Sequence, residues 1–199
     1  MNRRGDDLER MPREQQDACG TVDSVTRAVR GKIGTTAPMA GVEAFVAFAR
    51  QHLHDILDVS GQVLYSGAST LRQGDVYLLG LNPGGDPGNP DLLTIRQSLD
   101  RLVSNELAPG GVPWSEWNSY VHATWKGRDT LQRRIRWLLT RLGLDPLAVA
   151  ASNLIFPRSR DEKSLEYDAY ADVCWAVHKR VLEIVRPRVV LTYGNTPYR

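Results

Sequence analysis

The sequence contains few cysteines and no long apolar run. Its 199 residues include two cysteines, Cys19 and Cys174, which lie far apart and belong to no metal-binding motif. They exclude a four-cysteine cluster within this chain and fit a reducing compartment. No stretch is apolar enough to span a membrane, and no apolar core follows the basic start Met-Asn-Arg-Arg. We therefore expect a cytoplasmic protein with no membrane partner, no metal site and no cofactor.

An excess of charge of one sign is also missing. The formal net charge is +2, from 25 basic and 23 acidic residues, which is too small to identify a partner. With 42% hydrophobic and 24% charged residues, the composition is that of an ordinary soluble domain with a real core. In residues 1–38 the charges nearly cancel and apolar periodicity is weak, so we predict a mobile tail in preference to a basic arm that grips nucleic acid.

The most informative stretch is DVYLLGLNPGGDPGNP at residues 75–90. Its apolar run, residues 76–79, predicts a buried strand. The run stops in a loop that cannot continue a strand, because Pro83 lacks a donor while Gly84 and Gly85 favour unusual backbone angles. Asn82 is thereby placed at the carboxyl end of a central strand, where open α/β sheets bind ligands.

The rest of the chain predicts alternating helices and strands. Apolar periodicity predicts helices at residues 42–57, 92–107, 129–142 and 162–186, with Asp91 as the N-cap of the second. Leu131 and Leu142 are expected to face inward from the third helix. Further strands are predicted at residues 62–66, 149–156 and 189–193. The order of these elements predicts an α/β domain with a mostly parallel sheet and right-handed crossovers.

Two features beside the central loop have a functional and a structural interpretation. The crossing at residues 108–128 carries Trp114, Trp117, Tyr120 and Trp125, which can stack on bases or fill gaps in the core. Residues 125–141 form a basic patch with six cations and a single anion: Lys126, Arg128, Arg133, Arg134, Arg136 and Arg141, against Asp129. The patch suits a phosphate backbone, although most such runs are solvated helix faces.

A second asparagine, Asn153, interrupts the apolar strand at residues 149–156. Each asparagine alone is weak evidence, because this residue often forms turns. Together with the rigid Pro83-Gly84-Gly85 loop, they predict a polar pocket at the end of the sheet. Asp86 is a second catalytic candidate, although an aspartate before proline is more often a turn former.

The segment GLNPGG at Gly80–Gly85 resembles the first motif of the uracil-DNA glycosylase superfamily, and is closest to the mismatch-specific and single-strand-selective branches with Gly-x-Asn-Pro-Gly. SNLIF at Ser152–Phe156 is similar to the strand that ends in the base-reading asparagine of that family. RPRVVLTYGN at Arg186–Asn195 is similar to the strand that follows. The resemblance covers residue 42 to the C-terminus and implies a three-layer α/β/α fold.

The resemblance also implies roles for individual residues. Asn82 would orient the water that attacks the sugar, and Asn153 would hydrogen-bond the edge of a flipped base. Gly80, Leu81, Pro83, Gly84 and Gly85 would approach the substrate. The partner would be DNA that carries uracil or a related damaged base.

Two features depart from the family pattern. No His-Pro-Ser-like motif follows the third strand, and Leu92, Leu93 and Ile95 stand where an aromatic residue normally stacks on the base. The chain ends six residues after the third strand, so we expect the domain, residues 39–199, to lack its last strand and helix.

Three functional hypotheses follow. The first is a glycosylase that hydrolyses the N-glycosidic bond of uracil or a related base. The second is a catalytically inactive nucleic-acid- or nucleotide-binding protein of the same fold. The third is an unrelated α/β protein whose glycine loop holds a nucleotide phosphate. The loop lacks the lysine of a P-loop and the glycine spacing of a dinucleotide-binding motif, and both absences argue against this hypothesis.

Overall fold

The computed structural model describes residues 39–123 and 130–193. The predicted tail at residues 1–38 therefore lies outside the described residues, as do Lys126 and Arg128 of the basic patch. Within the described part, three parallel strands form one sheet in the order β2-β1-β3. They are β1 (Val76–Gly80), β2 (Ala150–Asn153) and β3 (Val189–Thr192). The predicted α/β class with a parallel sheet is confirmed.

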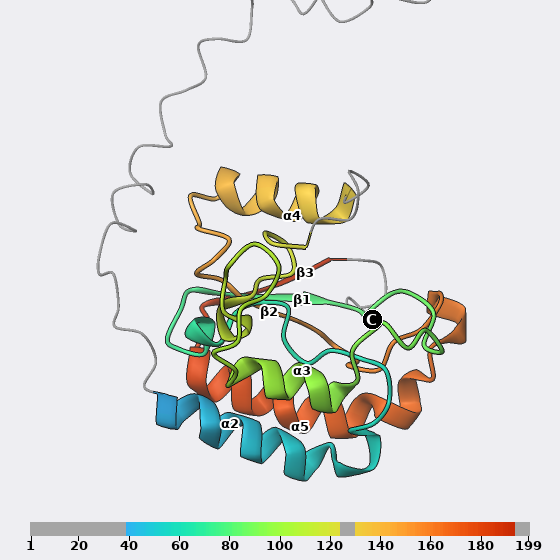
Figure 1. Ribbon diagram of the computed structural model, residues 1–199. Coiled ribbons are helices and arrows are strands. Elements are labelled where there is room, and N and C mark those ends of the chain that lie inside the picture. The colour runs from blue at the N-terminus through green and yellow to red at the C-terminus, as the bar shows by residue number, and fades with distance from the viewer. Residues whose placement is uncertain (1–38, 124–129, 194–199) are drawn as a thin grey trace, which may run out of the picture. The chain divides into compact units, whose positions relative to one another are not determined.

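Helices cover both faces of this sheet (Figure 1). On one face lie α2 (Met39–His52), α3 (Ile95–Leu102) and α5 (Tyr167–Val185), and on the other lies α4 (Thr130–Arg141). Short 3₁₀ turns connect them at His54–Ile56, Ala68–Thr70, Trp114–Glu116 and Glu162–Ser164. No helix of the described residues is both long and apolar enough to cross a membrane.

Alternation along the strands divides the core into two clusters. Tyr77 and Leu79 belong to the cluster with α2, α3 and α5, whereas Leu78 and Ala151 belong to the cluster with Ile135 and Leu139 of α4. Since residues two apart on a strand share a face, Gly80 and Asn153 lie on the α4 side. They are paired directly in the parallel register of β1 and β2.

The predicted strand at residues 62–66 is wrong as a regular strand, although the segment follows the free edge of β2. A single antiparallel bridge joins Leu64 to Ser152, and Tyr65 N donates to Ala151 O at 2.8 Å. Side chains replace the other ladder bonds: Ala151 N donates to Ser66 Oγ at 3.0 Å, and Ser152 Oγ donates to Val63 O at 2.5 Å. Backbone hydrogen-bonding groups along the free edge of β2 thereby find partners in this segment without a regular fourth strand.

Several predicted helix boundaries are also wrong. The N-cap of α3 is Thr94 instead of Asp91, because Thr94 and Gln97 form a reciprocal capping box. The long C-terminal helix begins at Tyr167 after a separate 3₁₀ turn, five residues later than predicted. In α4, Leu131 is 46% exposed and Leu142, just beyond the helix, is 54% exposed, so only Ile135 and Leu139 are buried.

Candidate functional site

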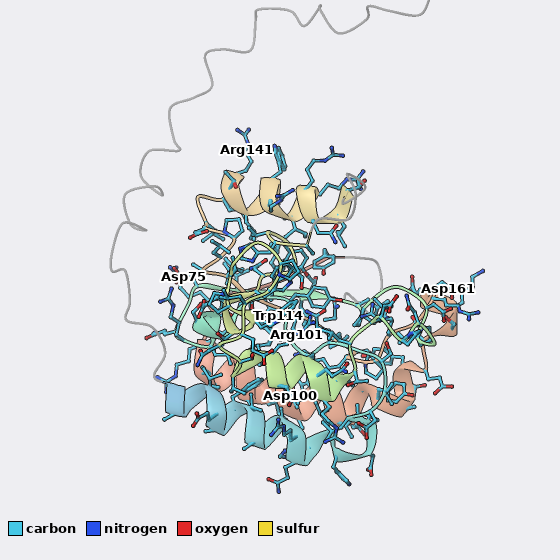
Figure 2. All side chains as sticks on the ribbon, in the orientation of Figure 1. Asp75, Asp100, Arg101, Trp114, Arg141 and Asp161 are labelled. Atoms are coloured by element: carbon cyan, nitrogen blue, oxygen red, sulfur yellow. The ribbon has the colours of Figure 1, made fainter. Side chains whose placement is uncertain are left out.

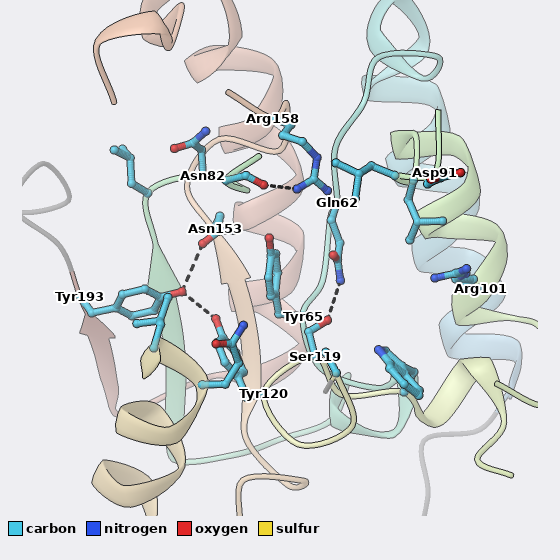
Figure 3. A pocket seen from close by; sticks show the side chains of 18 residues that line it. Gln62, Tyr65, Asn82, Asp91, Arg101, Ser119, Tyr120, Asn153, Arg158 and Tyr193 are labelled. Atoms are coloured by element: carbon cyan, nitrogen blue, oxygen red, sulfur yellow. Dashed lines mark hydrogen bonds between the residues drawn. The ribbon is translucent and has the colours of Figure 1, made fainter. Parts of the chain in front are cut away.

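A pocket of about 590 Å³ opens at the carboxyl ends of β1 and β2, and both α3 and α4 contribute residues to its lining (Figure 3). Its size is typical of small-molecule sites. Both predicted asparagines line it. The lining consists of Gln62, Tyr65, Leu81, Asn82, Gly84, Asp91, Leu92, Leu93, Arg101, Trp117, Ser119, Tyr120, Ala123, Leu131, Gln132, Asn153, Arg158 and Tyr193.

The side-chain amide of Asn82 has a defined orientation. Its Nδ2 donates to Pro83 O at 3.0 Å and to Ser159 Oγ at 2.8 Å. Ser159 Oγ uses its own hydrogen on Asp161 O at 2.7 Å, so towards Asn82 it acts as the acceptor. Both hydrogens of Nδ2 are therefore used within the protein, and Oδ1 is the amide atom left to accept a hydrogen bond.

Asn153 lies at the end of β2 and is almost fully buried. Its Oδ1 accepts a hydrogen bond from Tyr193 Oη at 3.4 Å, and Tyr193 Oη lies 2.7 Å from Tyr120 Oη (Figure 3). Each tyrosine hydroxyl carries one hydrogen, so Tyr193 donates to Asn153 and accepts from Tyr120. This chain of hydroxyls leaves the Asn153 Nδ2 as the donor of that amide.

Three tyrosines form the wall around Asn153. Burial raises the pKa of Tyr120 well above its usual value. Burial also raises the pKa of Tyr193, against a smaller opposing effect of its bond with Tyr120. For Tyr65 burial again raises the pKa, and a hydrogen bond with Asn153 is among the weaker opposing effects. All three hydroxyls therefore stay protonated at neutral pH, and Tyr193 and Tyr120 use their hydrogens within the chain that ends at Asn153.

Gly80 is required by this arrangement. A Cβ atom at this position would lie 2.2 Å from Asn153 Oδ1 and 2.4 Å from Tyr193 Oη. Ordinary van der Waals contact begins near 3.4 Å. Any side chain at residue 80 would therefore displace the amide and the hydroxyl that reach over the end of β1.

The loops after β1 and β2 run side by side beyond the sheet. Leu154 N donates to Gly80 O at 2.8 Å, and Ile155 N donates to Leu81 O at 2.9 Å. Further out, Ser159 N donates to Pro83 O at 3.1 Å. This pairing holds Asn82 and Asn153 on adjacent backbones, which is why residues from two distant segments reach one pocket.

The predicted substrate-contacting residues divide into two groups. Leu81, Asn82, Gly84 and Asn153 line the pocket, whereas Gly80, Pro83 and Gly85 are not among its lining residues. Gly80 lies beneath Asn153, Pro83 is buried, and Gly85 is exposed with φ +115°. Leu92 and Leu93 also line the pocket, and Ile95 is buried in the core.

Asp86, the second catalytic candidate, is outside the pocket lining. It forms a turn by accepting from Gly88 N at 3.0 Å and pairs with Arg160 at 3.1 Å. The Gly88 bond, followed by the Arg160 interaction, lowers the pKa of the Asp86 carboxyl. Asp86 therefore acts as the turn former that its sequence context suggests.

The basic patch lies partly in the described residues. Arg133 and Arg134 are exposed on α4, Arg136 is half-buried, and Arg141 points away from the sheet (Figure 2). Trp137 on the same helix is 64% exposed, with the Arg141 guanidinium 5.7 Å from its ring centre. The first turn of α4 supplies Leu131 and Gln132 to the pocket, so the same helix carries residues of the basic patch and of the pocket lining.

The aromatic residues of the long crossing take different positions. Trp117 and Tyr120 line the pocket, and Trp114 packs on Trp117 with ring centres 5.1 Å apart. Trp125 lies outside the described residues. Of the two tryptophans described in this segment, Trp117 lines the main pocket, and both line a smaller neighbouring cavity.

Sequence reasoning missed Tyr65, Tyr193, Gln62, Arg101 and Arg158 as pocket residues. Tyr193 could have been found by the same rule that identified Asn82, because it follows a parallel strand at its carboxyl end. Arg158 likewise follows the second strand. Gln62, Tyr65 and Arg101 come from segments whose local pattern gives no indication of a pocket.

The chain matches no family model, no curated protein and no solved structure. Among the described residues, no three His, Cys, Asp or Glu side chains form a group that could hold a metal ion. The polar side chains that line the pocket carry amide, hydroxyl and guanidinium groups, together with the carboxylate of Asp91 and the indole of Trp117.

Proposed function

We propose that this chain is a base-excising enzyme of the uracil-DNA glycosylase type, which hydrolyses the N-glycosidic bond of uracil or a related damaged base in DNA. The observation that carries the proposal is that Asn82 and Asn153, chosen from the motif resemblance, line the same pocket. Convergence of two amides at the ends of adjacent parallel strands is what base recognition combined with water positioning requires.

In this proposal Asn82 orients the water molecule that attacks the sugar carbon. Glycosidic cleavage passes through an oxocarbenium-like state, which depends on water position and on stabilisation of the departing base. The Asn82 Oδ1 is left as an acceptor because Pro83 O and Ser159 Oγ hold its Nδ2. An amide oxygen orients a water molecule but is a poor base, so we expect slow turnover.

In this proposal Asn153 forms hydrogen bonds with the edge of the extruded base. Uracil presents a carbonyl acceptor beside an N–H donor, which an amide can match side by side. With Oδ1 accepting from Tyr193, Nδ2 is the donor that the amide can supply to the carbonyl, while Oδ1 keeps one lone pair for the N–H. Cytosine would present an amino group to Nδ2, so this arrangement favours uracil over cytosine.

The excision test uses a labelled oligonucleotide with one deoxyuridine, as a single strand and as a duplex, followed by alkali to break abasic sites. Wild-type protein should cleave, and Asn82→Ala should lower the rate about a hundredfold, the order expected when a reacting group is misplaced. Asn105→Ala removes an exposed asparagine outside the pocket and should behave as wild type. Equal rates for Asn82→Ala and wild type would refute the assignment.

Base selection is tested with Tyr193→Phe. Loss of the hydroxyl removes the donor that holds Asn153 Oδ1. The side-chain amide can then flip, so that its oxygen and nitrogen exchange positions. The ratio of uracil to cytosine binding should fall, measured with free bases or with oligonucleotides. An unchanged ratio would show that Tyr193 does not set the orientation of the amide.

A second candidate function is DNA binding without excision. Among the described residues that line the pocket, Asp91 is the one carboxylate and none is a histidine, so Asp91 is the one side chain of these types there that could serve as a general base. The same oligonucleotides separate the two functions: saturable, deoxyuridine-dependent binding without any alkali-labile product indicates the binding protein.

The basic patch on α4 is proposed to contact the phosphate backbone. A variant in which Arg133, Arg134 and Arg136 are replaced by glutamine should show a smaller dependence of binding on salt concentration. Each lost phosphate contact should lower the slope of log K against log salt by about 0.7–0.9. An unchanged slope would remove the patch from the interface.

A further inference from the structure

Arg101 is a cation that forms no ion pair with any carboxylate in the described part of the chain. It lies in the last turn of α3, is half-buried, and stacks on Trp114 with its Cζ 3.4 Å from the ring centre. Among the described residues no ion pair and no side-chain hydrogen bond involves its guanidinium. Burial lowers the pKa of Arg101.

Arg96, on the same helix, shows the contrasting situation. Its Nε donates to Asp58 Oδ1 at 2.8 Å and its Nη2 to Asp58 Oδ2 at 3.0 Å, and the pair is exposed. It is absent from the pocket lining. The helix therefore places a neutralised arginine outside the pocket and an unneutralised one inside it.

The guanidinium of Arg101 faces the interior of the pocket. Figure 3 shows it pointing from α3 toward Gln62 and Ser119. It also lines a smaller cavity of about 60 Å³, which shares Gln62, Trp117 and Ser119 with the main pocket. Stacking on Trp114 fixes the plane of the guanidinium and leaves its N–H edge for a ligand.

We propose that Arg101 forms an anion subsite that binds a phosphodiester group next to the nucleotide whose base enters the pocket. The proposal rests on the proposed function for the identity of the anion. A guanidinium offers two parallel N–H donors that match the oxygens of a phosphate. Because no ion pair with another described residue has to be broken and the group is already partly desolvated, binding gains the charge-assisted interaction.

The subsite is tested with a fluorescein-labelled single-stranded oligodeoxynucleotide that carries one central deoxyuridine. A second version carries neutral methylphosphonate linkages on both sides of that nucleotide. Fluorescence polarisation at several salt concentrations gives the dissociation constant of each probe. Wild-type protein should bind the neutral version about tenfold to a hundredfold more weakly, as expected for loss of a charged hydrogen bond.

Arg101→Gln should weaken binding of the fully charged probe by the same factor and lower its salt slope by about 0.7. It should also bind both probes almost equally, because the group that distinguishes them is gone. Arg101→Lys keeps the charge without the planar fork and should give an intermediate loss. Arg96→Gln is the matched control and should behave as wild type.

The outcomes separate this proposal from the proposed function. Equal discrimination between the two probes by wild type and by Arg101→Gln would overturn the subsite, even if uracil is excised. Conversely, discrimination that disappears in Arg101→Gln would establish the subsite even if no alkali-labile product forms. Because the methylphosphonate substitution leaves the protein unchanged, a folding defect in a variant cannot produce the wild-type result.

Discussion

Replacement of Gly80 by alanine tests the geometry over the end of β1. The new Cβ would lie 2.2 Å from Asn153 Oδ1 and 2.4 Å from Tyr193 Oη, against about 3.4 Å for ordinary contact. Both atoms must therefore retreat by roughly 1 Å. Gly80 has no left-handed φ, so the backbone itself accepts alanine and the effect arises from the overlap.

The expected cost is that of overpacking a buried site, about 1–3 kcal/mol. For a chain of this length, 1 kcal/mol corresponds to about 2–4 °C in Tm, so Gly80→Ala should lower Tm by about 2–12 °C. Gly41→Ala is the matched control. Its Cβ would meet nothing within 4 Å on the exposed side of α2, and alanine stabilises helices by up to about 1 kcal/mol, so Tm should rise slightly.

Thermal unfolding followed by circular dichroism gives both values. The cause is checked by combining Gly80→Ala with Asn153→Ala, which removes one of the two overlapping groups. The double variant should be more stable than the sum of the single effects by about 1 kcal/mol, the usual size of coupling between touching residues. A Gly80→Ala variant as stable as wild type would refute the placement of Asn153 and Tyr193 over the strand.

Three further predictions concern the described fold. Thr94→Ala should cost about 0.5–2 kcal/mol in urea unfolding through loss of the α3 cap, whereas Asp91→Ala should stay within about 0.5 kcal/mol; the reverse order would restore Asp91 as the cap. Burial lowers the pKa of His178 from 6.5 to about 4, so the unfolded chain binds its proton first and stability should fall as pH drops through that window, by up to about 3 kcal/mol. His178→Gln should flatten that part of the stability curve, and an unaltered slope would contradict the assignment. Burial raises the pKa of Cys174 to about 12, so in a Cys19→Ser variant a thiol reagent should react only after denaturation, and fast reaction of the native protein would be inconsistent with the core.

The sheet was predictable because each parallel strand is an apolar run bounded by turn residues. Residues 76–79 and 189–193 match β1 and β3 closely. The second strand was predicted to reach residue 156 but ends at Asn153, although Leu154 and Ile155 still donate to Gly80 and Leu81. Residues 154–156 are apolar because they pack in the core, so the sequence gives no sign that the regular strand has ended. Only the backbone geometry shows where the hydrogen-bonded ladder of β2 stops.

Segments at the edge of the sheet were harder to predict. Residues 62–66 have the apolar composition of a strand, and they do follow β2. The regular ladder is interrupted because Ser66 and Ser152 side chains take bonds that a backbone partner would make. Such substitution of side chain for backbone depends on the neighbouring strand, so no local pattern predicts it.

The position of the two asparagines followed from the rule that strand ends gather at one edge of a parallel sheet. The direction in which each amide presents its atoms did not follow. For Asn82 that direction depends on Ser159, which lies on another loop and is itself committed to Asp161. For Asn153 it depends on Tyr193 and, through it, on Tyr120.

These second partners determine what the proposed site can do. An asparagine is both donor and acceptor, so its presence alone is compatible with either a water or a base as its ligand. Ser159 and Pro83 occupy the donor end of Asn82, which leaves an acceptor suited to water. Tyr193 occupies one acceptor position of Asn153, which leaves a donor suited to a carbonyl of the base. Both residues are asparagines, but Asn82 has only its oxygen left for a ligand, whereas Asn153 keeps its Nδ2 and one lone pair of Oδ1. The proposed division of roles between them depends on that difference.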